Sequence, residues 1–182
     1  MLTRGFTATS VDEICAEAGL TKGSFFHHFG TKDEFGEALL NDYWASTQEM
    51  LQAAPFVELA DPLERVHGYL DLFVALAGDD RVAKSCLFGN VSQELAPTHP
   101  ALRAACSAGF SRWADQIASD LEQAKRLHPP RDEFDSVGLA EHFIAIYEGS
   151  LVLAKAKGDA RVLADNVEHF RAYLDALFGR RS

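Results

Sequence analysis

Thr21, Lys22 and Ser24 place two short hydroxyls and an ammonium group within four residues of one another. If a helix begins here, these side chains and the free backbone N–H groups of the first turn can bind phosphate oxygens. Gly23 leaves room for the close approach of a nucleic-acid backbone. Lys32 would begin the next helix and add a second anion-binding end. These residues therefore indicate binding of a phosphate backbone.

Phe26, His27 and His28 would continue the same surface toward the end of this short segment. His28 can donate a hydrogen bond to phosphate in either protonation state, provided that the appropriate nitrogen carries the proton. A plainer interpretation stands beside this one. Phe25 and Phe29, four residues apart, fit a core, vicinal histidines are usually solvated, and glycine, threonine and lysine together also make an ordinary turn.

The helices that must position these side chains begin with a capping box. In Ser10 and Glu13 each side chain can satisfy the other's free backbone N–H, which predicts a short helix over 11–18. Gly19 then ends the helix as a left-handed cap, and Leu20 is expected in the core. Two short helices joined by such a turn match a helix-turn-helix, whose second helix lies in the major groove of DNA.

Further helix signals recur along the chain, and no alternating β-branched run indicates a sheet. Thr21 caps the second helix, which is expected to end at Phe29, and Thr31 opens a long third helix that Pro55 must end. The sequence predicts an all-α protein. Later helices are expected from Pro62 after its N-cap Asp61, within 85–96, and over about 100–128, 136–157 and 160–178.

The last two predicted helices carry more apolar residues than one face can bury in a monomer. We therefore expect a homodimer that forms through these helices. A small-molecule cavity in the middle helices is a second expectation, with apolar walls and a few polar groups, although aromatic residues at helical spacing are more often plain core. Its candidate lining residues are Phe73, Phe88, Asn90, Phe110, Trp113, Phe143 and Tyr147.

Composition limits the class of protein. The 182 residues are 47% hydrophobic and carry a formal charge of −10, so a nucleic-acid contact must come from a local patch. Cys15, Cys86 and Cys106 have neither zinc-site nor disulfide-framework spacing, and inert buried thiols in a reducing cytoplasm are expected. No signal peptide or membrane span is predicted.

The sequence lacks the common motifs of catalysis and metal binding. The seven histidines show no H-E-x-x-H spacing, and neither a G-x-S-x-G elbow nor a phosphate-cradling glycine loop is present. No metal, cofactor or enzymatic activity is therefore expected. An enzyme that uses His27 and His28 as acid and base is disfavoured because nothing orients them.

The segment "RGFTATSVDEICAEAGLTKGSFFHHFGTKDEFGEALL" resembles the DNA-binding domain of the tetracycline-repressor (TetR) family over about forty residues. The resemblance implies a helix-turn-helix domain over 1–45 and a helical ligand-binding and dimerisation domain over 46–182. It implies that Ser10 and Lys32 hold phosphates and that residues 21–24 meet bases and backbone. Phe26, His27 and His28 would lie along the groove.

Two features depart from the family pattern. Phe26 replaces the usual tyrosine, so a phenolic hydroxyl that could donate to phosphate is absent. The family's first helix precedes the RGF motif, and only residues 1–4 could remain of it. Without that helix, one side of the core would be uncovered at Val11, Ile14, Leu20, Phe25 and Phe29, so the biological polypeptide is expected to start further upstream.

Residues 1–45 hold three basic and seven acidic side chains, a formal charge of −4.

The resemblance implies a cytoplasmic, ligand-responsive transcriptional regulator, most often a repressor. Such a protein binds a near-palindromic operator in double-stranded DNA as a homodimer and is released by a small-molecule inducer. The third helix, which belongs to both parts, would transmit the change. The alternative is a dimeric small-molecule-binding module that has lost operator binding. The negative charge of residues 1–45 and the presence of Phe26 are consistent with this alternative.

Overall fold

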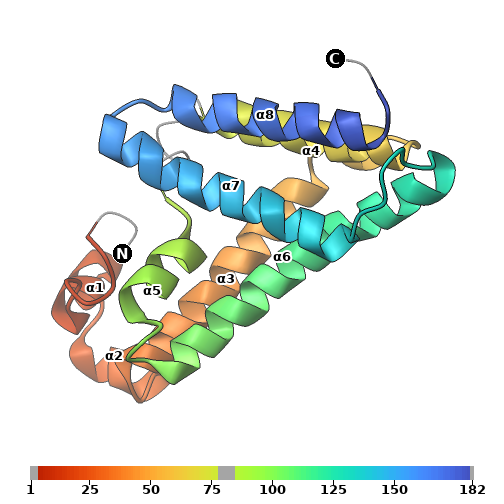
Figure 1. The fold of residues 1–182 in the computed structure, drawn as a ribbon. Helices are drawn as coiled ribbons and strands as arrows, with labels where there is room; N and C mark the ends of the chain where they lie inside the picture. The colour runs from red at the N-terminus through yellow and green to blue at the C-terminus, as the bar shows by residue number, and fades with distance from the viewer. Residues whose placement is uncertain (1–3, 78–84, 181–182) are drawn as a thin grey trace. The chain divides into compact units, whose positions relative to one another are not determined.

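The computed structural model describes residues 4–77 and 85–180, and within them the chain is helical without a β-strand (Figure 1). The predicted all-α class is confirmed. Of residues 1–4, which could remain of the family's first helix, residues 1–3 lie outside the described part. The elements are α1 (Val11–Ala18), α2 (Lys22–His28), α3 (Lys32–Gln52), the 3-10 helix η1 (Pro55–Glu58), α4 (Pro62–Ala77), α5 (Leu87–Leu95), α6 (Pro100–Leu127), α7 (Ser136–Lys157) and α8 (Arg161–Leu177).

The helices form two compact units. Of the described residues, unit 1 contains 4–48 and 85–110, so α5 and the first part of α6 pack with the N-terminal helices. Unit 2 contains the described residues 49–77 and 111–180. The functional boundary after residue 45 stays a prediction.

The capping signals read from the sequence define the short helices of unit 1. The Ser10 hydroxyl accepts from the Glu13 N–H at 3.2 Å, and the Glu13 carboxylate accepts from the Ser10 N–H at 2.8 Å. Gly19 ends α1 at φ 65°, a left-handed conformation that glycine adopts without steric cost. Leu20 was expected in the core, and this was wrong: it is 55% exposed. The turn that follows Gly19 directs Leu20 outward while Phe25, one turn into α2, is buried instead.

The interior of unit 1 depends on two close approaches to glycine. A Cβ at Gly36 of α3 would lie 2.8 Å from the Phe6 ring and 2.9 Å from the Leu102 side chain. A Cβ at Gly109 of α6 would lie 2.3 Å from the Phe88 ring. Only glycine therefore lets these rings reach the helix backbones without displacement.

Unit 2 has an aromatic core that α4, α6, α7 and α8 supply. Phe73 lies at its centre, with its ring centroid 4.8 Å from that of Tyr69, 5.9 Å from Trp113, 5.5 Å from Phe143 and 4.8 Å from Tyr147. All five rings are buried. Such offset and edge-to-face pairs add stabilisation beyond the burial of apolar area.

Helix α7 is long and apolar enough to cross a membrane by length and composition alone. Core helices of soluble proteins pass the same test, and one face of α7 is buried inside unit 2. Its buried side chains include Leu139, Phe143, Ile144, Tyr147 and Leu151. The helix is thus accounted for as a core element.

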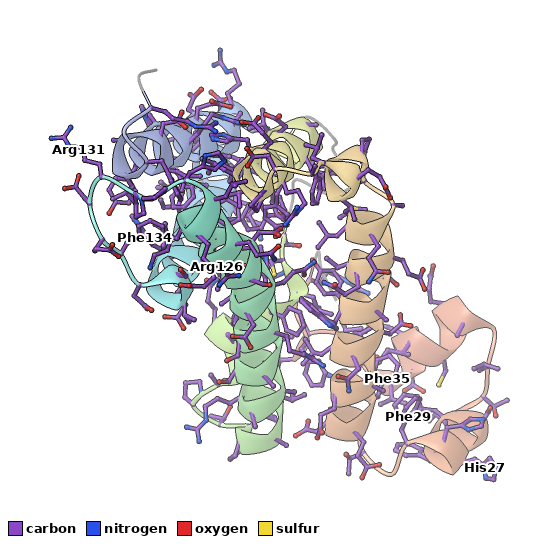
Figure 2. All side chains as sticks on the ribbon, turned by 90° about the vertical axis from the view of Figure 1, so that its right-hand side faces the viewer. His27, Phe29, Phe35, Arg126, Arg131 and Phe134 are labelled. Carbon is purple, nitrogen blue, oxygen red and sulfur yellow. The ribbon has the colours of Figure 1, made fainter. Side chains whose placement is uncertain are left out.

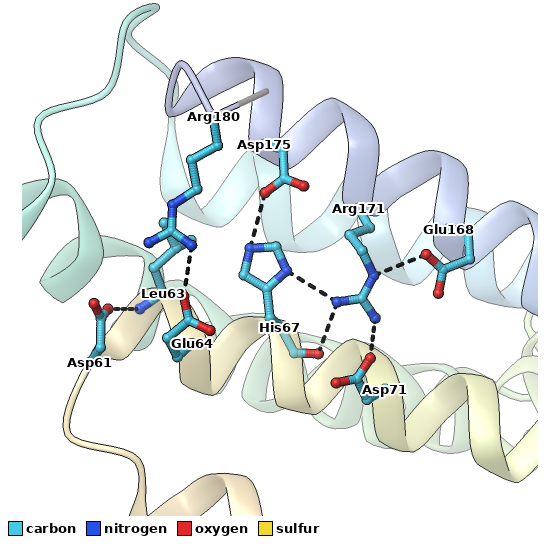
Figure 3. Close-up of polar contacts among 9 residues, drawn as sticks. All are labelled: Asp61, Leu63, Glu64, His67, Asp71, Glu168, Arg171, Asp175 and Arg180. Atoms are coloured by element: carbon cyan, nitrogen blue, oxygen red, sulfur yellow. Dashed lines mark hydrogen bonds and ion pairs between the residues drawn. The ribbon is translucent and has the colours of Figure 1, made fainter. Parts of the chain in front are cut away.

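Polar contacts join α4 to α8 along their exposed edge (Figure 3). The Arg171 guanidinium contacts Asp71, Glu168 and the ring nitrogen Nδ1 of His67, the last at 3.1 Å. Because a guanidinium only donates, the Nδ1 atom of His67 must accept, which places the proton of a neutral ring on Nε2. This arrangement fixes the relative register of the two helices.

Candidate nucleic-acid interface

The first turn of α2 presents the predicted phosphate-binding groups on the surface. Thr21 caps the helix by accepting the N–H of Ser24 at 3.1 Å, and Thr21, Lys22 and Gly23 are exposed. The ammonium of Lys22 lies 2.8 Å from the carboxylate of Asp12 on α1. Exposed ion pairs contribute little, so a phosphate can compete for this ammonium group.

Gly23 has open space around it. A Cβ there would have one neighbour, the Thr21 hydroxyl at 3.7 Å, which is an ordinary contact distance. The fold of unit 1 therefore does not require glycine at this position on steric grounds. Its predicted role, to leave room for the close approach of a nucleic-acid backbone, stays a prediction.

The outer face of α2 continues through three predicted contact residues. Phe26 is 52% exposed, and His27 and His28 are also exposed, with ring centroids 5.2 Å apart. Figure 2 shows His27 at the outer edge of α2, whereas Phe29 and Phe35 turn toward each other, with centroids 5.2 Å apart. The helix thus buries Phe25 and offers the side chains that the sequence assigned to DNA.

Lys32 begins α3, as the sequence predicted, but its side chain points toward the N-terminal segment. Its ammonium group donates to the carbonyl oxygen of Phe6 at 2.5 Å and lies 4.4 Å from the centroid of the Phe6 ring. The side chain therefore runs inward across the start of α3. The predicted phosphate contact of Lys32 would require this side chain to turn outward.

Ser10 is exposed at the start of α1, but its hydroxyl already serves the helix cap. It donates to the Glu13 carboxylate at 2.9 Å while accepting the Glu13 N–H. Glu13 also accepts from the Arg4 guanidinium at 2.9 Å, and hydrogen bonds from Ser10 and Arg4 lower the pKa of the Glu13 carboxyl. Ser10 could reach a phosphate through its backbone N–H or hydroxyl after exchange of these bonds.

Sequence reasoning missed Glu94, which contacts the N-terminal segment of unit 1. Its carboxylate oxygens accept from the backbone N–H groups of Phe6 and Thr7, each at 2.7 Å. Burial raises the pKa of the Glu94 carboxyl, but hydrogen bonds from Thr7 and Phe6 and the Lys32 charge together lower it. Local sequence patterns do not predict this contact, because Glu94 and Phe6 lie 88 positions apart in the chain.

An open groove of about 780 Å³ lies over α1 and α3 of unit 1. Ile14 and Ala18 line it from α1, and Phe35 and Leu39 line it from α3. Ile14 was expected to lack neighbours on one side, and it lines this groove and is only partly buried. The corresponding expectation does not hold for Phe25, which is 5% exposed.

The predicted ligand-binding residues divide between the two units. Phe73, Trp113, Phe143 and Tyr147 come together in the aromatic core of unit 2, whereas Phe88, Asn90 and Phe110 belong to unit 1. The phenolic oxygen of Tyr69, which the sequence prediction omitted, accepts a hydrogen bond from the Trp113 indole. The tyrosine hydroxyls and the indole N–H are the polar groups that the unit 2 cluster contains.

The three cysteines are buried and unpaired by disulfides. Burial raises the pKa of the Cys106 thiol, although a hydrogen bond with Ser92 opposes the shift. A raised pKa lowers the thiolate fraction, which is the reactive form. This agrees with the expectation that Cys106 is an inert core thiol.

Comparison with known proteins agrees with this geometry. The family described as "Bacterial regulatory proteins, tetR family" matches residues 1–39, and "Tetracyclin repressor-like, C-terminal domain" matches residues 62–170. The transcriptional regulator AcuR of Cereibacter sphaeroides is 31% identical over 156 residues, which cover 84% of this chain and 69% of that protein. The repressor DhaR of a Mycobacterium species is 25% identical over 154 residues, 85% of this chain and 76% of that protein.

Solved structures show the same fold. A regulatory protein TetR from Rhodobacter sphaeroides superposes with a TM-score of 0.79 at 30% identity, covering 93% of this chain and 90% of that one. Reduced NemR from E. coli superposes with a TM-score of 0.81 at 23% identity, covering 93% and 88%. The chain therefore belongs to the TetR family of helix-turn-helix transcriptional regulators.

Proposed function

We propose that this regulator is a repressor that binds a near-palindromic operator as a homodimer, and that a small-molecule inducer releases it. The observation that carries the proposal is the outward face of α2. Thr21, Lys22 and Gly23 are exposed at the capped start of this helix, and Phe26 is exposed one turn further on. Two such helices in a dimer would read two half-sites about one DNA turn, or a multiple, apart. A cytoplasmic location follows from this role.

Exposed apolar residues on the last two helices support the dimer. Val152 and Leu153 of α7 are 47% and 46% exposed, and Tyr173 of α8 is 45% exposed. These side chains lie on the outside of unit 2, where a second copy could bury them in a four-helix interface. Relatives named as repressors, DhaR among them, support the repressor assignment.

The inducer is proposed to act on the aromatic core of unit 2. It would shift the population of conformations away from the DNA-binding one by no more than its differential affinity for the two. The proposed inducer is an apolar or aromatic molecule with one or two hydrogen-bonding groups, the chemistry that the rings of Phe73 and Trp113 would bind.

The test is selection of bound sequences from a random DNA pool with the full-length protein, followed by titration at several salt concentrations. We expect a short palindrome and a steep salt dependence, and Lys22→Ala should reduce the salt slope by about one. Lys157→Ala, at the exposed end of α7, is the control and should leave the slope unchanged. Failure to bind any sequence at low salt would favour the alternative, a dimeric small-molecule-binding module without operator binding.

A further inference from the structure

The N-terminal segment of unit 1 is held in a turn before α1. Gly5 has φ 86°, the Thr9 hydroxyl donates to the Gly5 carbonyl at 2.7 Å, and the Thr9 N–H donates to the Phe6 carbonyl at 3.2 Å. The ring of Phe6 is 4% exposed and lies against Gly36. This segment leads directly to Ser10, which caps α1, so its position sets where α1 begins.

A single side chain from α5 binds the outer edge of this turn. The two carboxylate oxygens of Glu94 each accept one backbone N–H, from Phe6 and from Thr7. Anionic acceptors make stronger hydrogen bonds than neutral ones. Gly5 has a φ that L side chains rarely adopt, and a Cβ there would lie 2.8 Å from Oε2 of Glu94, so another residue would strain the turn and displace the carboxylate.

The same turn holds Lys32. The Phe6 carbonyl accepts from the Lys32 ammonium, and the Phe6 ring lies beneath that ammonium. The Lys32 charge also acts on the Glu94 carboxylate, which it stabilises. Glu94, Phe6 and Lys32 thus connect α5 to the N-terminus of α3 through one peptide unit.

We propose that Glu94 is a positioning residue for DNA binding, which couples the placement of α5 to the placement of Lys32 and the helix-turn-helix. The inference rests on the proposed operator binding. Since α5 follows α4 in the chain, a ligand that displaces α5 would withdraw the carboxylate from both N–H groups. The turn would then lose the contacts with Glu94 and Lys32 that anchor it, and the start of α1, against which α2 packs, would loosen.

The carboxylate is suited to a reversible contact. Glu94 is an exposed residue, and two hydrogen bonds of an exposed carboxylate can exchange with water at low cost. The buried rings of unit 1, by contrast, cannot separate without exposing apolar surface. Displacement of α5 would therefore break the Glu94 contact before it disrupts the core.

The test compares Glu94→Gln and Glu94→Ala with Gln93→Ala, a neighbouring exposed position of α5. Two quantities are measured on the full-length protein: hydrogen exchange of the Phe6 and Thr7 amides, and affinity for the selected palindrome and for an unrelated duplex. Both Glu94 variants should speed exchange at these amides and lower palindrome affinity about tenfold, with little effect on the unrelated duplex. Gln93→Ala should change neither quantity.

A double-mutant cycle with Lys32→Met separates positioning from general stability. If Glu94 acts through Lys32, Glu94→Gln should cost markedly less palindrome affinity in the Lys32→Met background. Unprotected Phe6 and Thr7 amides in the wild type, or an unchanged affinity when these amides exchange faster in Glu94→Gln, would overturn the inference and leave operator binding intact. If the wild-type protein binds no palindrome, the proposed function itself fails, although the exchange result still reports the Glu94 contact.

Discussion

The indole N–H of Trp113 donates a hydrogen bond to the phenolic oxygen of Tyr69 inside unit 2, where both rings are buried. The two residues come from α6 and α4, so the bond joins elements far apart in the chain. Burial raises the pKa of the Tyr69 hydroxyl, although the bond from Trp113 opposes the shift. Tyr69 is therefore neutral at physiological pH.

Tyr69→Phe should lower the free energy of unfolding by about 1–3 kcal/mol, because the buried hydrogen bond from the Trp113 N–H to the Tyr69 hydroxyl would be lost. Chemical denaturation followed by tryptophan fluorescence measures this loss. Ser111→Ala is the control: it removes a hydroxyl from an exposed position of α6, where water can replace it, so an effect within about 0.5 kcal/mol is expected. Equal stabilities for the two variants would contradict the assigned role of the bond.

Gly109→Ala should destabilise unit 1 although alanine is the better helix former by about 1 kcal/mol. The added Cβ would meet the Phe88 ring at 2.3 Å, and Phe110 and Tyr43 already pack against that ring. Overpacking of this kind costs about 1–3 kcal/mol, which outweighs the propensity gain. Thermal unfolding checks the sign, with Ser107→Ala on the exposed side of α6 as a control that should be neutral or stabilising.

Local signals in the sequence were sufficient for the helices. The bounds of α1 and α7 match the prediction, and the other expected helices were placed to within a few residues, since Ser10, Thr21 and Gly19 act on their immediate neighbours. Leu20 was misplaced because the turn determines its direction and periodicity does not.

Long-range contacts explain what the sequence did not indicate about the site. The exposure of α2 follows from its short length and from Phe25, both visible in the sequence. The inward course of Lys32 depends on the Phe6 carbonyl, 26 residues away, and on Glu94. The sequence around Glu94 is that of an ordinary helix surface, so it does not indicate that the carboxylate binds Phe6 and Thr7. The contact follows from the packing of unit 1.

Asp159 should titrate near pH 2 in the folded protein. Hydrogen bonds from the Arg161 side chain and backbone N–H lower its pKa from 3.8 to about 2. Because the folded pKa is depressed, the contribution to stability is complete above about pH 4 and is lost as the pH falls toward 2. NMR titration of the carboxyl carbon checks the value, and in Arg161→Gln the pKa should return toward 3.8. An unchanged pKa in that variant would remove the Arg161 side chain as a cause.

Phe26→Tyr should strengthen operator binding about three- to tenfold. Phe26 is 52% exposed on the outer face of α2, so a phenolic hydroxyl there could donate to a phosphate without disturbing the core. Equilibrium titration of the selected palindrome measures the change. Phe26→Leu, which keeps an apolar side chain but adds no hydroxyl, should not gain affinity. A similar gain in both variants would assign the effect to something other than the hydrogen bond.

Gly149→Leu should dissociate the proposed dimer and leave the protomer folded. A Cβ at Gly149 has no atom within 4 Å in the protomer, so a larger side chain meets no obstacle from its own chain. It would stand between two copies of α7 beside the exposed Val152 and Leu153 and keep the helices apart.

Sedimentation should show the mass of one chain at concentrations where the wild type is dimeric, with the dimer dissociation constant raised about a hundredfold or more. The circular dichroism spectrum should be unchanged. Ser111→Leu adds the same side chain at an exposed position of α6 and should remain dimeric. If Gly149→Leu stays dimeric as well, the last two helices do not form the interface, because a buried helix-helix contact through Gly149 leaves no room for a leucine.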